Sequence, residues 1–427
     1  MHTKSRRFRL IASVALGSLL PSASVTAQLA NASAATLGLA GNATAIARGF
    51  GAISVNPAGL GMPGAGFSLA VAPFSVRQGL GPVTLSDLKD VQGTLVPNAT
   101  KEDWLARVAA RGSQTGQVGV EVSEFALSMG HLGFQLSTVA GASMNLTPDM
   151  VEAMLFGNAG RNGAPVDLSL VGSNLRAFGV TTAGLSYGRP VSSALGEMAL
   201  GVTLKYSVGH VVAAGRDEGG STQSDPVRVD LAFPLVTFDQ DGGGFNNGSG
   251  IGADLGFQMK AGRVSLGAAI LNAFNTFGWN EEKLVYRPGT TILEEGRTAT
   301  DFEKQPLASA PAEVRQTLED MRFDPTISVG AAYDIDEDFT VSADVRNRFG
   351  DGMSLTPKLH AGVGAEYRGL SALDLRGGAA MISGGVQVSG GASLILGRVN
   401  LSFAGAVQRG DMEDATIAQF SLSWGGR

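Results

Sequence analysis

The fold of this chain is decided by residues 197–208, which read EMALGVTLKYSV. Every second residue from Met198 to Val208 is apolar, and the residues between them are small, polar or charged. This period of two predicts a β-strand, because successive side chains of a strand point to opposite faces of the sheet. One face of the strand is therefore apolar, and the other carries Thr203, Lys205 and Ser207.

The same alternation recurs along the chain in segments of about ten residues. It is found at 250–259, 326–334, 338–347, 359–368 and 415–424. Strands of this length suit a transmembrane β-barrel, in which the apolar face meets lipid and the polar face meets the lumen. A soluble β-sandwich or β-helix shows the same alternation with its apolar face inward. The strand length, the charges in mid-strand and an export signal favour the barrel.

The connections between these segments alternate between short and long. Gly130-His131, Ala261-Gly262 and Gly397-Arg398 are short, whereas 77–121, 140–175, 209–248 and 273–325 are long. Bacterial outer-membrane barrels have short periplasmic turns and long external loops. If 229–238 is a hairpin inside a long loop, about fourteen strands run from 66–76 to 415–424. We therefore predict an all-β fold: an antiparallel transmembrane outer-membrane β-barrel over residues 66–427.

Residues 1–27 have the layout of a secretory signal peptide. Lys4, Arg6, Arg7 and Arg9 precede an apolar run at 10–20, which is too short to span a bilayer as a helix. Val25-Thr26-Ala27 then supplies a small-x-small cleavage site. We predict cleavage near Ala27 and export to the bacterial outer membrane. The chain has no cysteine, so no disulfide framework supports it.

Residues 28–65 lack the alternation and are rich in small residues. They contain the turn Asn56-Pro57-Ala58, in which proline restricts the backbone and the asparagine side chain can bond a nearby backbone group. A glycine-rich lead followed by Asn-Pro-Ala resembles the start of the FadL-type family of outer-membrane transporters and its PorV-like relatives. The resemblance implies that 28–65 folds inward as a plug, with Asn56, Pro57 and Ala58 at its gate. A plain turn into the first strand stays open as the alternative.

The resemblance covers most of the chain more loosely. Segments 250–256 and 270–272 look like mid-barrel strands of these relatives, and 146–158 is similar to a loop of PorV-like members. The chain departs from the pattern at 424–427, because barrel proteins typically end on an aromatic residue. No ligand-contacting motif of the family can be placed here, so none is carried over.

Three long loops contain helix signals. Thr147-Pro148 supplies an N-cap and a first-turn proline, Thr100 and Asp103 resemble a capping box, and Pro311 opens a third amphipathic run. We predict that apolar side chains of these helices line a hydrophobic entrance. The alternative is that the helices pack on one another and cap the barrel. The predicted entrance residues are Met150, Met154, Leu155 and Trp104.

The polar faces of the strands carry charges of both signs. An unpaired charge in a plugged lumen is costly, so we predict that salt bridges hold the lumen around the plug, a structural role that is favoured over ion selectivity. Asp374 and Arg376 lie beside Glu366 and Arg368 on adjacent strands, which suits cross-strand pairing. The predicted lumenal network comprises Glu197, Lys205, Asp254, Asp344, Arg346, Glu366, Arg368, Asp374 and Arg376.

Signals for enzymatic chemistry are weak. Of His131, His210 and His360, only His360 lies on an inward face, and no motif pairs it with a nucleophile. The acidic residues at 334–338 fit a solvated turn better than an ion site. We predict no enzymatic activity, no metal and no cofactor. A net charge of −6 without a basic cluster argues against nucleic acid as a partner.

Three classes of function remain. The first is a passive channel for uptake of hydrophobic, fatty-acid-like small molecules, gated by the plug and surrounded by membrane lipid and lipopolysaccharide. The second is a PorV-like barrel that binds or shuttles secreted proteins at the cell surface. The third, a general porin, fits poorly with the segment 28–65. A hydrophobic channel also predicts an opening in the wall, for which the glycine pairs 377–378 and 390–391 leave room.

Overall fold

The computed structural model describes residues 29–425 apart from 65, 158–159, 165, 225–226, 240–243, 295–296 and 411–413. The predicted signal peptide and its cleavage site lie outside these residues. Among the described helices, none is both long and apolar enough to cross a membrane.

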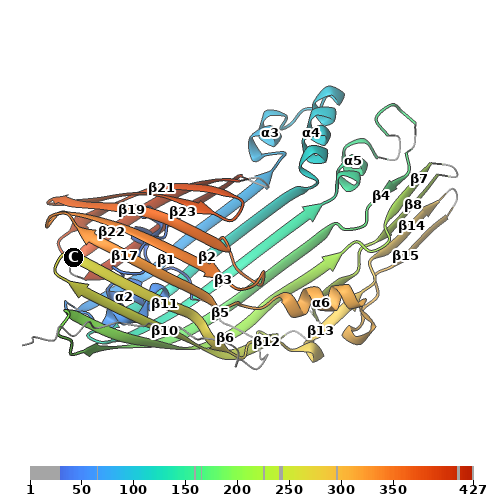
Figure 1. Ribbon diagram of the computed structural model, residues 1–427. Helices are drawn as coiled ribbons and strands as arrows, with labels where there is room; N and C mark the ends of the chain where they lie inside the picture. Colours follow the sequence, from blue (N-terminus) through green and yellow to red (C-terminus); the bar gives the residue numbers. More distant parts are fainter. Residues whose placement is uncertain are drawn as a thin grey trace, which may run out of the picture.

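Antiparallel strands close into a single barrel (Figure 1). Strand β1 pairs with β2 on one side and with β23 on the other, so the wall has no free edge. The predicted fold class is confirmed, and so is the strand number of fourteen. Around the barrel the strands are β1 (Phe67–Gly81), β2 (Gln114–Met129), β3 (Leu132–Leu146), β5 (Asn174–Val191), β6 (Glu197–Arg216), β10 (Gly248–Ala261), β11 (Val264–Asn275), β17 (Thr326–Asp334), β18 (Phe339–Arg348), β19 (Leu359–Leu370), β20 (Leu373–Ile382), β21 (Gly385–Leu396), β22 (Val399–Gly410) and β23 (Asp414–Gly425).

The two ends of the barrel differ. One end carries tight turns, such as the one at 397–398, and we call it the short-turn end. At the other, the long-loop end, the sheet is extended by β9 (Leu235–Phe238), β12 (Gly278–Trp279), β13 (Leu284–Arg287) and β16 (Gln305–Pro306). A separate five-stranded sheet also projects there (Figure 1), built from β4 (Leu168–Ser169), β7 (Ser221–Ser224), β8 (Val227–Ala232), β14 (Thr290–Glu294) and β15 (Arg297–Asp301).

The helices of the long loops lie at the same end. They are α3 (Leu85–Asp90), α4 (Asn98–Arg111), α5 (Pro148–Phe156) and α6 (Ala312–Asp320), with short 3-10 turns η3 (Glu281–Lys283) and η4 (Leu307–Ser309). The signal at Thr147-Pro148 is confirmed, because the Thr147 side chain caps α5. The capping box proposed at Thr100 is wrong: α4 already begins at Asn98, and the capping box lies at Thr84 and Asp87 of α3.

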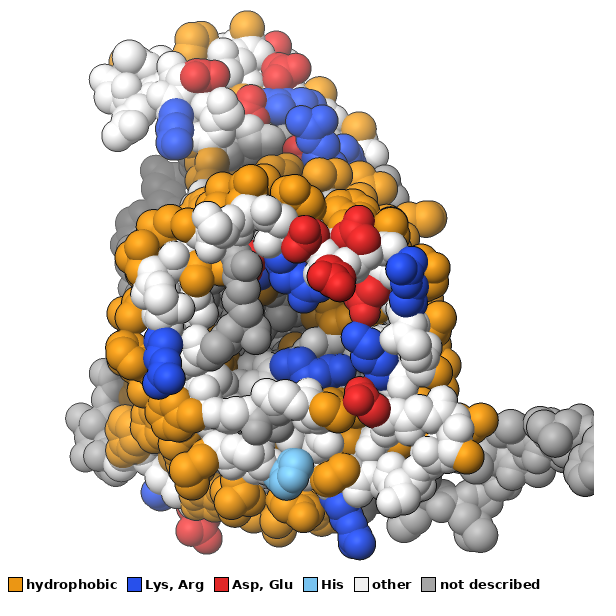
Figure 2. All heavy atoms as spheres, turned by 90° about the vertical axis from the view of Figure 1, so that its left-hand side faces the viewer, with side chains coloured by type: hydrophobic (Ala, Val, Ile, Leu, Met, Phe, Trp, Pro, Cys, Tyr) orange, Lys and Arg blue, Asp and Glu red, His pale blue; other side chains and the backbone are white. Residues whose placement is uncertain are grey.

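The wall is apolar outside and polar inside. On β6, Leu200, Leu204 and Tyr206 are exposed, whereas Lys205 and Ser207 are buried. A soluble sandwich would show the opposite burial. Figure 2 shows the short-turn end, where hydrophobic side chains cover the outer circumference and charged side chains gather within the rim.

Strand boundaries differ from the sequence prediction at the long-loop end. Strand β6 continues to Arg216, well past the predicted end at Val208. The β5–β6 register shifts next to His210, so the alternation of β6 changes phase there. The predicted hairpin at 229–238 is also wrong, because β8 pairs with β7 and β14 whereas β9 pairs with β6 and β13.

Residues 29–64, which we call the lumenal segment, lie inside the barrel. They form α1 (Ala34–Gly38), α2 (Gly49–Val55) and η1 (Pro57–Gly61). Inward side chains from several sides hold their backbone: Gln135 of β3 donates to Ala30 O, Ser342 of β18 to Asn42 O and Gln419 of β23 to Asn31 O. The segment therefore crosses the lumen from wall to wall.

The strand register of the wall is not interrupted at the glycine pairs 377–378 and 390–391, where the sequence left room for an opening. The ladders through 377–378 and 390–391 keep their register. Register shifts occur instead between Val71 and Phe74 of β1, beside Glu124 of β2, and opposite Asp254, where β11 bulges around Asn272. Asn272 adopts a positive φ of 58°, and its bulge turns Leu271 and Asn272 toward the lumen.

Candidate functional site in the barrel lumen

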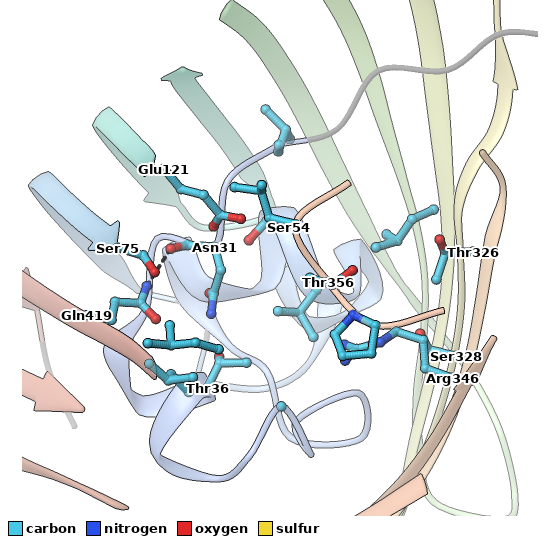
Figure 3. A pocket seen from close by; sticks show the side chains of 18 of the residues that line it. Asn31, Thr36, Ser54, Ser75, Glu121, Thr326, Ser328, Arg346, Thr356 and Gln419 are labelled. Carbon is cyan, nitrogen blue, oxygen red and sulfur yellow. Dashed lines mark hydrogen bonds between the residues drawn. The ribbon is translucent and has the colours of Figure 1, made fainter. Parts of the chain in front are cut away.

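A cavity of about 150 Å³, the inner cavity, lies between the lumenal segment and the wall (Figure 3). Its size is comparable to that of engineered apolar cavities that take up benzene. Part of its lining is aliphatic and comes both from the lumenal segment and from the wall. The aliphatic lining residues are Leu29, Leu37, Val55, Leu271, Leu355 and Ile417.

Polar side chains line opposite sides of the inner cavity (Figure 3). Ser75, Glu121 and Gln419 lie with Asn31 on one side, where Gln419 Nε2 donates to Asn31 O over 2.7 Å. Thr326, Ser328 and Arg346 lie on the other. A site with aliphatic surface and a few polar groups suits a small amphipathic molecule.

Arg346 on β18 is the notable charge of this site. Its Nε is buried without a hydrogen-bond partner among the described residues. Asp344, two residues earlier, binds the lumenal segment through one carboxylate oxygen: its Oδ2 accepts from Ala43 N at 3.0 Å, Thr44 N at 2.9 Å and Thr44 Oγ1 at 2.7 Å, whereas its Oδ1 has no hydrogen-bond partner among the described residues. Because its Nε has no hydrogen-bond partner among the described residues, the guanidinium keeps a donor that can serve an anionic or polar group in the cavity.

A second cavity of about 410 Å³, the outer cavity, opens toward the long-loop end. Residues 349–358 connect β18 to β19 and fold inward between the two cavities, and we call them the strap. Leu355, Thr356 and Pro357 of the strap line both cavities. Arg77 of β1 also borders both, and its Nη1 donates to Gln408 Oε1 over 2.7 Å.

The residues of the Asn-Pro-Ala turn are fully buried but do not line either cavity. Asn56 Nδ2 donates to Thr44 O at 2.9 Å and to Phe257 O of β10 at 3.0 Å. Its Oδ1 accepts from Ala58 N at 3.2 Å and so caps η1. The turn ties the lumenal segment both to itself and to the wall.

The inward charges fall into separate groups. Lys205 and Asp254 form a buried pair of 2.5 Å, and Lys205 also donates to Asn272 Oδ1. Arg376 lies 2.7 Å from Glu366 and 3.5 Å from Asp374, and Arg368 lies 3.5 Å from Glu366. Glu197 is exposed at the start of β6, outside these groups. Of the nine predicted members, only Arg346 lines the inner cavity.

The predicted entrance residues lie on α4 and α5. Trp104 is buried with Leu105, Val108 and Val151, and Leu155 packs against this cluster. Met154 is exposed, and Met150 is half-buried. None of the four lines the inner or the outer cavity.

Of the residues that line the inner cavity, only Arg346 was predicted as a site residue, and Arg77, Glu121 and Leu355 show why others were not. Arg77 and Glu121 fell inside the predicted long loop 77–121, although both are inward positions of β1 and β2. The alternation of Val118, Val120 and Val122 with Gly119, Glu121 and Ser123 is a signal that could have found Glu121. Leu355 lies in a connection without periodicity, and no pattern marks it as inward.

A closed fourteen-stranded antiparallel barrel is also the fold of solved FadL-type outer-membrane transporters. Among solved structures, the toluene transporter TbuX of Ralstonia pickettii is similar, with a TM-score of 0.54, 15% identity and coverage of 92% of this chain and 97% of that one. The toluene transporter TodX of P. putida is similar with a TM-score of 0.52 and 13% identity, over 92% of this chain and 98% of that one. A FadL homologue of Pseudomonas aeruginosa is similar with a TM-score of 0.50 and 13% identity, over 94% of this chain and 99% of that one.

Comparison at the level of sequence is less specific. Residues 69–273 match a family of unknown function, DUF5723. No curated protein matches the chain. At these identities the likeness to solved structures establishes the fold and leaves the ligand to be argued from the site.

Proposed function

We propose that this protein is a passive channel of the bacterial outer membrane for hydrophobic, fatty-acid-like small molecules, exported with cleavage near Ala27. The inner cavity carries the proposal, because it combines aliphatic surface with the unpartnered Nε of Arg346. The fold likeness to toluene transporters and to a FadL homologue supports the same class of ligand.

In this proposal residues 28–65 act as the plug and 66–427 as the channel. Asn56, Pro57 and Ala58 anchor the plug, together with the hydrogen bonds from Thr44 to Asp344. The inward charges hold wall strands together. Met154, exposed on α5, and its neighbours Met150, Leu155 and Trp104 form the hydrophobic entrance.

The ligand in this proposal has an apolar body and an anionic or polar head. Leu37, Leu271 and Ile417 receive the body. Arg346 receives the head, since hydrogen bonds to a charged group contribute about 1.5–3 kcal/mol. That free energy corresponds to roughly a tenfold or greater change in the dissociation constant.

The test is native mass spectrometry of detergent-purified protein, first with co-purifying molecules retained and then with added octanoate, 1-octanol and toluene. We expect an apolar small molecule in the purified protein. Arg346→Gln should weaken octanoate binding about tenfold and leave toluene unchanged. Arg398→Gln, in the tight turn at 397–398, is the charge-matched control. An empty protein that binds none of the three compounds contradicts the proposal.

The PorV-like alternative is favoured by one feature, the five-stranded sheet outside the barrel. Its edge strand β15 pairs with β14 alone among the described strands. A free strand edge is a surface to which an extended segment of another protein can add. Stoichiometric secreted proteins in the same purified sample, in place of small molecules, would move the conclusion to this function.

A further inference from the structure

The strap is the one connection that separates the inner from the outer cavity among the described residues. Its tip, Leu355, is buried and packs on the lumenal face of the paired strands β2 and β3. There it meets Gly119 and Gly141, which are cross-strand partners. A Cβ added at Gly119 would stand 2.6 Å from Leu355 Cδ1, and one at Gly141 would stand 2.7 Å from Cδ2. The two glycines therefore form a seat shaped for this side chain.

The ends of the strap are fixed by hydrogen bonds. Arg348 donates through Nε to Gly350 O at 3.1 Å and through Nη1 to Thr356 O at 2.7 Å. Gly352 N donates to Asp324 Oδ2 at 2.7 Å. Met353 packs into the apolar cluster of α6 and the ends of β5 and β6. The strap on both sides of Leu355 is thus held by polar contacts and by the packing of Met353.

The tip is held differently. Leu355 packs with Val139 and Phe178 of the wall and with Ala30 of the lumenal segment. These are apolar contacts without a direction, so an apolar molecule of suitable size can replace them. Ala30 is itself tied to the wall through Ser137 and Gln135. Displacement of Leu355 therefore removes one packing partner of the lumenal segment.

We infer that the strap is the selective constriction of the channel and that Leu355 is its specificity-determining residue. A ligand passes from the outer to the inner cavity by displacing Leu355 from its glycine seat, and its cross-section decides how readily it does so. This inference rests on the proposed function, because it presupposes that ligands move between the two cavities.

The test uses the absence of cysteine in the chain. Leu355 Cγ lies 3.1 Å from the position of a Cβ at residue 119, a spacing within reach of a disulfide between Gly119→Cys and Leu355→Cys. The measurement is entry of toluene and of the larger N-phenyl-1-naphthylamine into bacterial cells that produce each variant. We expect the oxidised double variant to lose at least nine-tenths of the uptake, roughly a tenfold loss that reductant reverses. Leu355→Ala should raise entry of the larger probe several-fold relative to toluene.

The control is a disulfide elsewhere in the lumen, Ser393→Cys with Ser402→Cys, at a directly opposed pair whose Oγ atoms lie 2.7 Å apart. Its oxidation should leave uptake unchanged. Normal uptake by the oxidised strap variant, with the disulfide verified by mass, overturns the inference alone. Wild-type uptake no greater than that of cells lacking the protein overturns the proposed function, and the inference with it.

Discussion

At the scale of single residues, the ion pair of Lys205 and Asp254 is the clearest determinant of the site's shape. Their side chains are only 1% and 2% exposed. Asp254 Oδ1 also accepts from Asn272 N at 2.6 Å. Because Lys205 donates to the Asn272 side chain as well, the pair fixes the bulge of β11 that lines the inner cavity.

Removal of one member of this pair should destabilise the barrel. Lys205→Met leaves Asp254 buried without its counter-ion, for which we expect a loss of about 3–5 kcal/mol. Urea unfolding in detergent micelles, followed by tryptophan fluorescence, measures the loss. The double variant Lys205→Met, Asp254→Leu removes both charges and should recover most of it. A single variant as stable as the wild type would refute a role for the pair.

The sequence predicted that Lys205 and Asp254 point into the lumen, but it did not predict that they form an ion pair with each other. The apolar–polar alternation along a strand shows on which face of the sheet each side chain lies. Which side chains meet across two strands depends on the register between those strands. The tight turn between β19 and β20 limits the register, which is why contacts between Glu366 and Arg376 could be anticipated. Lys205 and Asp254 are separated by the long connection 217–247, which leaves the register open.

At the scale of elements, α3 and α4 are joined by an ion pair outside the barrel wall. Arg107 of α4 lies 3.0 Å from Asp87 Oδ1 of α3. Burial raises the pKa of Asp87, but hydrogen bonds from Arg107 and Thr84 outweigh it and lower the pKa to about 2. Ionised Asp87 therefore contributes its full stabilisation of the folded state above the ordinary aspartate pKa of about 3.9, and this contribution is lost as the pH falls toward 2.

Removal of the Arg107 guanidinium should change the pH at which the Asp87 carboxyl titrates. Arg107→Gln is expected to return the pKa of Asp87 toward about 3.9. A carbon-13 NMR titration of the labelled aspartate carboxyls in detergent measures it. Arg111→Gln, one turn along α4, is the control because Arg111 does not contribute to the shift of Asp87. A midpoint that stays near 2 in Arg107→Gln would assign the shift to other groups.

Elements with strong local signals could be predicted, and those that depend on tertiary pairing could not. The N-cap and proline of α5 and the proline before α6 were sufficient to place those helices. The five-stranded sheet was missed because strands such as β7, STQS, and β15, RTATD, are short and lack apolar alternation. They are stabilised by pairing between two loops that are distant in sequence.

At the scale of the whole molecule, glycines of the inner wall accommodate the lumenal segment. A Cβ at Gly201 of β6 would overlap Ala58 N and the backbone of Pro57, and one at Gly256 of β10 would overlap Asn56 Oδ1. The sequence showed that glycines occupy the polar faces, but not what they contact. The inward fold of 28–65 came from a family resemblance, since its small residues have no periodicity.

Filling one of these positions should push the lumenal segment aside. We expect Gly201→Leu to raise ion conductance in planar bilayers several-fold above the wild-type level, because the backbone of η1 can no longer pack on the wall. Gly377→Leu is the matched control, as nothing lies within 4 Å of a Cβ there. Heat-modified migration of both variants confirms that the barrel has formed. Equal conductance in wild type and Gly201→Leu would show that the segment does not obstruct the lumen.

The unequal lengths of the wall strands have a consequence for how molecules arrive. Strand β6 has 20 residues and β5 has 18, whereas β20 and β21, across the barrel from them, have 10 and 12. With strands tilted by about 40°, a mean difference of about eight residues makes one side roughly 20 Å taller than the other. The rim at the long-loop end is therefore oblique, and its low side is at β20 and β21. Figure 1 shows the short strand β21 on the side opposite the long strands β5 and β6. In the proposed channel, a molecule that spreads over the membrane surface would reach the low side of the mouth by two-dimensional diffusion, whereas on the opposite side the tall strands would block its path.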